Sequence, residues 1–150
     1  MLKEAVKTCE IKYNIPIMKF RLPLLVIAAI AAIHIPLTFS GLYYRLTNID
    51  ILMHFAGGLA MGLLAIAIHH DMTDRHDLKG HPLWYHYLFV IGFVMLIGVA
   101  WEFHEYIFDN TLAIWYQWPK TQLDLADTML DLVMDGVGGT TAFLLFKKGL

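Results

Sequence analysis

Four long apolar stretches constrain this chain more than any other feature of its sequence. They lie at roughly residues 22–44, 49–69, 84–108 and 125–146, and each is near the ~20 residues that an α-helix needs to cross a ~30 Å hydrocarbon core. Hydrophobic residues make up 58% of the 150 residues and charged residues only 16%, an apolar share above that of ordinary soluble domains. The sequence therefore predicts an all-α integral membrane bundle of four transmembrane helices.

Lys and Arg predict the orientation of these helices, because short loops rich in the two residues stay cytoplasmic. If the N-terminus is inside, nine of the 11 Lys and Arg residues fall on the inner side, and only Arg45 and Lys120 fall outside. We therefore expect a multi-pass protein of the inner (cytoplasmic) membrane with both termini cytoplasmic. Residues 1–21 are then a cytoplasmic or interfacial N-terminal segment, and residues 22–150 form the four-helix transmembrane domain.

Several function classes leave no trace in the sequence. Cys9 is the only cysteine, so an intrachain disulfide is excluded. No basic patch with interleaved aromatic residues suggests nucleic acid, and there is no nucleophile elbow, phosphate loop or dinucleotide motif. The partners we expect are membrane lipids, and the sequence leaves open whether the chain forms an oligomer.

An acidic stripe interrupts the last apolar stretch. Asp127, Asp131 and Asp135 recur at every fourth position within ADTMLDLVMDG, a spacing that puts all three carboxylates on one face of a helix. An Asp at the centre of a membrane helix costs about 2.5–3.5 kcal/mol, whereas a Leu, Val or Phe returns only about 0.3–0.6 kcal/mol. Something in the assembled bundle must therefore neutralise these groups: protonation, an ordered water cavity, a cationic ligand or a bound metal.

Two other stretches bring ionisable residues to the same depth. A rise of ~1.5 Å per residue puts His54 roughly 7 Å below the outer surface, and Glu102 and Asp131 roughly 9 Å below it. Glu105 shares a helical face with Glu102. Small residues, which favour close helix contact in membranes, continue two of these polar faces, so we expect the faces to point inward at one another. These small residues are Gly58 and Gly62 on the second stretch and Gly138, Gly139 and Ala142 on the fourth.

One His with several carboxylates on converging helices suits a divalent cation. His and Asp/Glu ligands are compatible with Zn, Mn or Fe, and an oxygen-rich majority also suits Mg or Ca. A dication would offset the charge of two carboxylates. Glu105 and Asp135 are also the candidate catalytic residues, because a spare carboxylate can act as a general base. The predicted metal ligands are His54, Glu102, Asp131 and either Glu105 or Asp135.

Three motifs, DILMHFAGG, EFHE and DTMLDLVMDGVGG, follow one another on the last three predicted helices. In this order they resemble the VanZ-like and YjdF-like families of small bacterial membrane proteins. Those families carry an Asp and a His four residues apart opening one helix, a Glu ending the next, and an Asp-rich segment running into glycines on the last. The likeness covers roughly residues 50–142. The residues at the matching positions are Asp50, His54, Glu102, Asp131 and Gly138.

The chain departs from the VanZ-like pattern at two positions. Asp135 stands where those proteins often have Asn, and Glu105 stands where they often have Gln. The DTMLD run is closer to the YjdF-like group. The resemblance implies a role in the cell envelope, since some VanZ-like members are linked to glycopeptide-antibiotic resistance. It implies no particular reaction, so it supports the site more than its chemistry.

The leading functional prediction is an outward-facing intramembrane carboxylate/His site that binds a divalent metal and acts on a lipid-linked or cell-envelope substrate. A metal-dependent hydrolase or transferase would use the ion to activate water or to clamp a phosphate, and the sequence leaves open whether the protein is an enzyme. One alternative is a proton-coupled or cation transporter, because chains of Asp, Glu and His also serve as proton relays. Another is a non-catalytic binding or assembly protein whose Trp-rich outer loop meets a partner.

The remaining polar residues are expected to pack, to be solvated or to lie at the surface rather than to form part of the site. His104 is turned about 200° from Glu102 on the same helix, so it is left out of the site. His34 is expected to pack or to bind water. The outer loop, residues 109–124, is expected to lie along the surface as a partial lid, because its Trp and Tyr residues favour the membrane–water boundary. A solvated inner loop, rather than a metal site, is expected for His69, His70, Asp71, Asp74, His76 and Asp77.

Overall fold

The computed structural model describes residues 2–76, 81–122 and 124–147, and these residues are almost entirely helical. The described part of the chain contains no strand, so the predicted all-α class is confirmed. An α-helix satisfies its backbone hydrogen bonds within its own segment, which is what lipid requires of a spanning segment. The helices are α1 (Leu2–Ser40), α2 (Leu42–Arg45), α3 (Thr47–His76), α4 (Leu83–Asn110), α5 (Leu112–Tyr116) and α6 (Leu125–Phe146).

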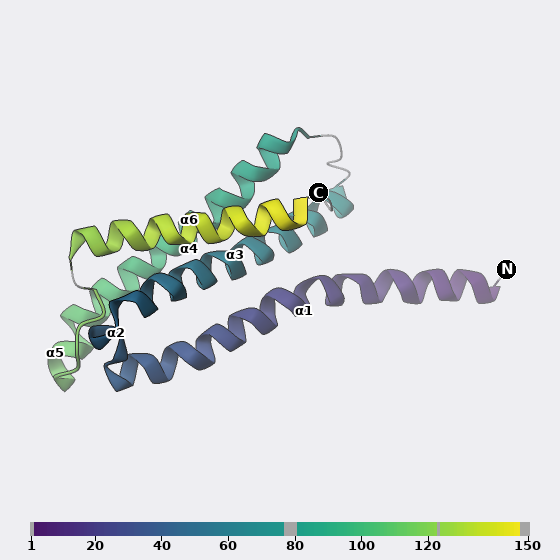
Figure 1. Ribbon diagram of the computed structural model, residues 1–150. Helices are drawn as coiled ribbons and strands as arrows, with labels where there is room; N and C mark the ends of the chain where they lie inside the picture. Colours follow the sequence, from purple (N-terminus) through teal and green to yellow (C-terminus); the bar gives the residue numbers. More distant parts are fainter. Residues whose placement is uncertain (1, 77–80, 123, 148–150) are drawn as a thin grey trace.

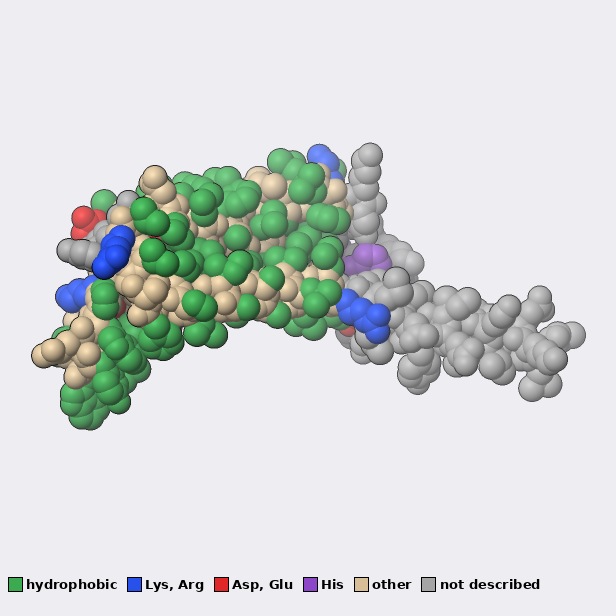
Figure 2. Space-filling model, turned by 60° about the horizontal axis from the view of Figure 1, so that its bottom comes forward, with side chains coloured by type: hydrophobic (Ala, Val, Ile, Leu, Met, Phe, Trp, Pro, Cys, Tyr) green, Lys and Arg blue, Asp and Glu red, His purple; other side chains and the backbone are tan. Residues whose placement is uncertain are grey.

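Four segments of the described residues are long and apolar enough to cross a membrane. They are Phe20–Ser40, Asn48–Thr73, Leu83–Tyr116 and Leu125–Phe146. Each overlaps one of the four stretches predicted from the sequence, so the predicted number of spans is confirmed. Hydrophobic side chains cover the middle of the face shown in Figure 2, and the Lys, Arg, Asp and Glu side chains on it lie near the two ends. This distribution matches a protein whose middle lies in hydrocarbon.

The first helix is continuous from Leu2 to Ser40 and carries no break near residue 21. The division into an N-terminal segment and a transmembrane domain therefore stays a prediction. Gly41 ends α1 and turns the chain into α2 with a φ of 68°, in the left-handed region that favours glycine. The turn directs α3 back alongside α1.

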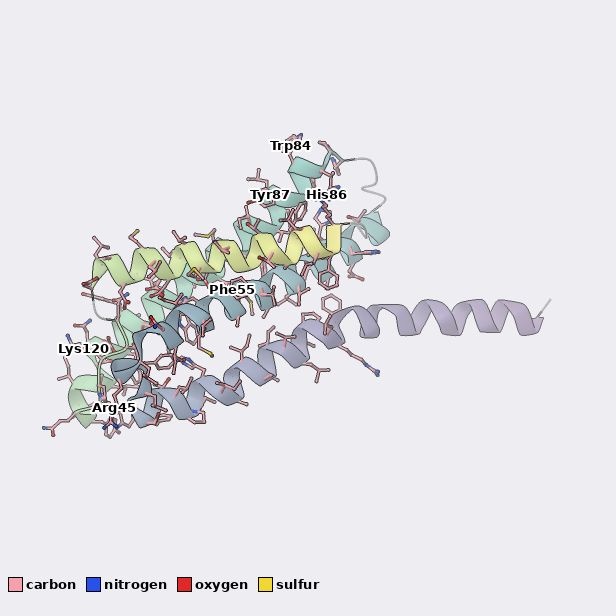
Figure 3. The ribbon with its side chains drawn as sticks, viewed as in Figure 1. Arg45, Phe55, Trp84, His86, Tyr87 and Lys120 are labelled. Carbon is pink, nitrogen blue, oxygen red and sulfur yellow. The ribbon has the colours of Figure 1, made fainter. Side chains whose placement is uncertain are left out.

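The helices form a bundle in which α3 and α6 lie side by side and α4 packs against both (Figure 1). α1 packs mainly against α3. The N-terminal end of α1 and the C-terminal end of α6 lie at one end of the bundle, and α2 and α5 lie at the other (Figure 1). Arg45 and Lys120 also lie at the α2 and α5 end, whereas His86 lies at the opposite one (Figure 3). The two basic residues predicted to lie outside thus share one side of the bundle.

Glycines bring α3 and α6 into backbone contact. A Cβ atom on Gly58 would lie 2.6 Å from the Cα of Asp135, and one on Gly138 would lie 2.6 Å from the backbone nitrogen of Leu59. A Cβ on Gly62 would lie 2.8 Å from the Cβ of Ala142. The expected close approach at small residues is therefore present, and it sets the distance across which α3 and α6 present their polar side chains.

Candidate functional site

His54 is the centre of a buried polar cluster between α3, α4 and α6. Its side chain is 6% exposed, and its Nδ1 atom lies 3.4 Å from Oδ2 of Asp135 on α6. Gly98 of α4 makes room for this carboxylate, because a Cβ atom there would lie 3.3 Å from Cγ of Asp135. The contact fixes one side of the imidazole ring and leaves the other nitrogen to different partners.

The Nε2 atom of His54 faces three further carboxylates, one on α3 itself, one on α4 and one on α6. It lies 3.8 Å from Oδ1 of Asp50, one turn earlier on α3. It lies 3.8 Å from Oε1 of Glu102 on α4 and 3.9 Å from Oδ2 of Asp131 on α6. Three helices thus converge on a single ring nitrogen.

Two sets of side chains in this cluster could hold a metal ion. One is Asp50, His54 and Asp131, and the other is His54, Glu102 and Glu105. Within each set the potential ligand atoms lie within 4.8 Å of one another. His54 belongs to both sets, so it is the residue on which any ion in this cluster would depend. The imidazole nitrogen and carboxylate oxygens are donors that Zn, Mn and Fe accept.

Two carboxylate oxygens in the cluster are buried without a hydrogen-bond partner. They are Oε1 of Glu102 and Oδ1 of Asp131, on side chains that are 6% and 2% exposed. Buried polar atoms are nearly always satisfied, because an unpaired one costs roughly 1–3 kcal/mol and a charged one more. Among the side chains that the structure describes, no Lys or Arg pairs with these acids. Within the described residues, His54 is therefore the side chain beside these acids that could carry a positive charge.

The structure brings together all the residues predicted for the site. His104 and His34, which were not predicted to belong to it, lie outside the cluster. His104 is exposed and stacks near Phe108, with ring centroids 6.3 Å apart. His34 lies outside the cluster, where its Nδ1 is 2.7 Å from the hydroxyl of Tyr43. Asp127, at the outer end of the acidic stripe, is half-buried. The residues brought together are His54, Glu102, Glu105, Asp131 and Asp135, and their metal-binding and catalytic roles stay predictions.

Asp50 and Gln122 belong to the cluster but were not predicted as site residues. The spacing of four between Asp50 and His54 on one helical face was the signal for Asp50. Gln122 lies in a loop and carries no such signal. Its side-chain amide donates to Oε2 of Glu102 at 3.0 Å and contacts Oγ1 of Thr128 at 2.7 Å. One Glu102 oxygen is thus satisfied by Gln122, and the other faces His54.

A strap, residues 117–122, carries Gln122 over the cluster. Asp109, which is 3% exposed, anchors it from the end of α4. The carboxylate accepts hydrogen bonds from the backbone nitrogen of Thr121 at 3.0 Å and of Gln122 at 2.9 Å, and from the Thr121 hydroxyl at 3.1 Å. The outer loop thus covers Glu102, as a partial lid would, whereas Trp115 before it is 82% exposed.

Cavities lie on two sides of the cluster, and residues of the cluster line both. One of about 610 Å³ lies between α4, the strap and the start of α6, and Glu102, Lys120 and Gln122 line it. The other, of about 330 Å³, lies between α1, α3 and α4 and reaches His54 and Asp135. The walls of both cavities are mostly apolar, and those of the first carry the larger share of polar surface.

The expected inner loop is wrong for five of its six residues, because His69, His70, Asp71, Asp74 and His76 lie in α3. α3 continues to His76, and His69 is buried within it at 5% exposure. Its Nε2 atom lies 3.3 Å from Nδ1 of His86, which is equally buried. The apolar stretch was expected to end at residue 69, but the helix runs on for two further turns. Asp77 lies outside the described residues, as do the side chains of Asp74 and His76.

Comparison with known proteins identifies the family. The model of the family described as "Predicted membrane protein (DUF2238)" matches residues 10–148. No match was found among curated proteins or among solved structures. The finding supports a family of membrane proteins and does not single out the VanZ-like or YjdF-like groups, so that finer resemblance stays a prediction. Since the match covers nearly the whole chain, including every helix that contributes to the cluster, the protein belongs to the DUF2238 family of predicted membrane proteins.

Proposed function

We propose that this multi-pass membrane protein binds one divalent metal ion at the His54 cluster and uses it on a lipid-linked or cell-envelope substrate at the outer side of the inner membrane. The observation that carries the proposal is the pair of buried, unpartnered oxygens on Glu102 and Asp131, both on carboxylates that face Nε2 of His54. A divalent cation would satisfy these oxygens and offset two negative charges. Buried ionisable groups in membranes are functional sites by default.

The distances support a metal of ordinary coordination geometry. Ligand atoms bound at about 2.0–2.2 Å to a tetrahedral ion lie roughly 3.3–3.6 Å apart. Nε2 of His54 lies 3.8 Å from Glu102 and 3.9 Å from Asp131. A movement of a few tenths of an ångström would bring His54 to metal-binding distance of either carboxylate, and the ligand set would be completed by Asp50 in the case of Asp131 or by Glu105 in the case of Glu102. Zn, Mn and Fe fit the mixed donors, and Mg fits the oxygen-rich majority.

The contacts suggest a division of roles. Asp135 contacts Nδ1 of His54, the position of the carboxylate that orients a metal-bound imidazole and makes it a better ligand. We therefore assign Asp135 a positioning role, and we place the ion at the Nε2 atom of the ring. Glu105, in a set with His54 and Glu102, is the spare carboxylate that would accept a proton from a metal-bound water.

Proton or cation transport is the competing function. The apolar core in the inner half of the bundle is an argument against it. The next buried titratable pair along α3, His69 with His86, lies at the far end, roughly 22 Å from His54 at ~1.5 Å per residue. Between them Ala65, Val90 and Phe143 form an apolar core. A proton relay needs polar groups or water along its route, and the side chains that form this core are apolar.

Elemental analysis of purified protein tests the metal directly. The chain should carry a purification tag without histidine, because a histidine tag binds the same ions. We expect about one Zn, Mn, Fe or Mg per wild-type chain and a loss of that metal in His54→Ala. His104→Ala is the matched control, because this exposed residue lies outside the cluster, and it should keep the metal.

Two outcomes would contradict the proposal. One is wild-type protein without metal above background after dialysis against each of the four ions. The other is a His54→Ala variant with unchanged metal content. If the metal were absent and a phenotype survived Glu102→Gln and Asp131→Asn, the non-catalytic assembly function would be the better one.

A further inference from the structure

The apolar cavity beside His54 has the architecture of a lipid chain-binding site. It measures about 330 Å³, within the roughly 300–1,000 Å³ of small-ligand pockets. Ala60 and Val94 form part of its closed wall and are 0% and 1% exposed. Its other end is polar, because His54 and Asp135 line it. An occupant must therefore combine a hydrocarbon body with a polar end.

The depth of the cavity matches one leaflet of a bilayer. α3 lines it from Asp50, two residues inside its membrane span, to Met61. Asp50 and Met61 are eleven positions apart, which corresponds to roughly 16 Å along the helix at ~1.5 Å per residue. Half of a ~30 Å hydrocarbon core is about 15 Å. A lipid in this cavity would hold its polar end at His54, roughly 6 Å deeper than Asp50 at ~1.5 Å per residue, and would direct its hydrocarbon chain toward the middle of the bilayer.

The rim of the cavity faces the bilayer between α1 and α4. Ile35 on α1 is 55% exposed, and Ile97 and Trp101 on α4 are 36% and 37% exposed, and all three line the cavity. α1 packs mainly against α3, so its other flank borders this rim. A chain from the surrounding leaflet would pass between α1 and α4 without crossing a layer of water.

From these features we infer that the cavity holds the hydrocarbon chain of a membrane phospholipid, taken laterally between α1 and α4, with its phosphate at the His54 cluster. The head-group part rests on the proposed metal, because five carboxylates without a cation would repel an anion. The chain part rests only on the cavity. The substrate of the site is accordingly an anionic, phosphate-bearing lipid rather than a soluble envelope component.

Photolabelling of wild-type protein in vesicles tests the inference. The vesicles contain phosphatidylcholine and phosphatidic acid that carries a diazirine on one acyl chain. Labelling of Ala60 and Val94 is the informative readout, because lipid outside the bundle does not reach these buried positions. We expect both to be labelled, and we expect Ala31→Phe, which places a ring in the cavity, to reduce their labelling about tenfold.

The neighbouring alanine is the matched control. Ala32 is exposed on α1 and does not line the cavity, so Ala32→Phe should leave the labelling unchanged. A second pair on α4 covers the case in which Ala31→Phe fails to fold: Ile97→Trp fills the cavity, whereas Leu96→Trp points elsewhere at 67% exposure. Unlabelled Ala60 and Val94 in wild type would overturn the inference, as would equal labelling in both members of a pair.

Metal content measured on the same samples separates the two proposals. Labelling at Ala60 and Val94 without any bound metal would support the chain-binding cavity and contradict the metal site. Metal without labelling would contradict the cavity and leave the metal site standing. If both hold, a chelator should lower labelling by phosphatidic acid more than labelling by an equally labelled phosphatidylcholine, because only the former presents an uncapped phosphate to the ion.

Discussion

The Nε2 atom of His54 on α3 lies 3.8 Å from Oε1 of Glu102 on α4, and this oxygen is buried without a hydrogen-bond partner. The other oxygen of the same carboxylate accepts from Gln122. One side of Glu102 is thus held by the strap, and the other is directed at the imidazole. Because a cation bound to both atoms would remove the cost of the unpaired oxygen, this pair is where metal binding can be tested most sharply.

Replacement of Glu102 by Gln should weaken metal binding strongly while the helix bundle stays intact. The amide keeps the size of the side chain and the acceptor for Gln122, but it removes a negative charge from the cluster. We expect the affinity for the metal to fall by about tenfold to a hundredfold or more, measured by competition with a fluorescent chelator. His104→Gln, on the exposed face of the same helix, should bind the metal as the wild type does.

Asp135→Asn separates positioning from direct coordination. If Asp135 orients the ring of His54 through Nδ1, the variant should still bind one metal ion, with an affinity lower by about tenfold to a hundredfold. If Asp135 is itself a ligand, the metal should be lost as completely as in His54→Ala. Titration of the two variants side by side, with the stoichiometry determined by elemental analysis, decides between these roles.

Metal removal should destabilise the protein. A ligand that binds only the folded state at about 100 times its dissociation constant adds about 2.7 kcal/mol of stability. We therefore expect a chelator to lower the midpoint of thermal unfolding in detergent, and re-addition of the metal to restore it. His54→Ala should show the lower midpoint from the start and no response to the chelator. An equal response in the two proteins would place the metal elsewhere in the molecule.

Gly58→Ala should destabilise the bundle, because a Cβ atom there would collide with the backbone of Asp135. Overpacking of this kind costs about 1–3 kcal/mol, and it would also shift Asp135 away from His54. Gly92→Ala is the matched control on α4, since no atom lies within 4 Å of the Cβ it would add. Thermal unfolding followed by circular dichroism should show a lower midpoint for the first variant and not for the second.

The fold and most of the cluster could be predicted because membrane insertion makes local sequence unusually informative. An uninterrupted apolar run of about 20 residues indicates a membrane-spanning helix. The depth of each residue in the membrane then follows from the rise of the helix per residue. Depth and helical face together were enough to group His54 with Glu102 and Asp131. Facing glycines on α3 and α6 added the contact that brings these faces together.

What could not be predicted depends on tertiary contacts of residues outside regular patterns. Gln122 contacts Glu102 from a strap that Asp109 also contacts, and no periodicity in the loop encodes that arrangement. The prediction for His69 was wrong because the polar residues after position 69 were expected to end the helix. Instead, these polar residues continue α3, and the His69 ring is buried against the ring of His86. The apolar cavity likewise depends on how α1, α3 and α4 pack around it, which hydropathy does not record.

Asp109→Ala should release the strap and, through it, Gln122. The carboxylate accepts hydrogen bonds from two backbone nitrogens and one hydroxyl of the strap, and the loss of charged acceptors costs about 1.5–3 kcal/mol for each such bond in unfavourable cases. We expect faster hydrogen exchange of the Thr121 and Gln122 amides, together with weaker metal binding as Glu102 loses its donor. Asn110→Ala removes a neighbouring side chain that donates to the Tyr106 carbonyl of its own helix, so it controls for general loss of polarity. Unchanged exchange at Thr121 and Gln122 in Asp109→Ala would show that the strap is held by its other contacts, and Asp109 would then have no part in positioning the site.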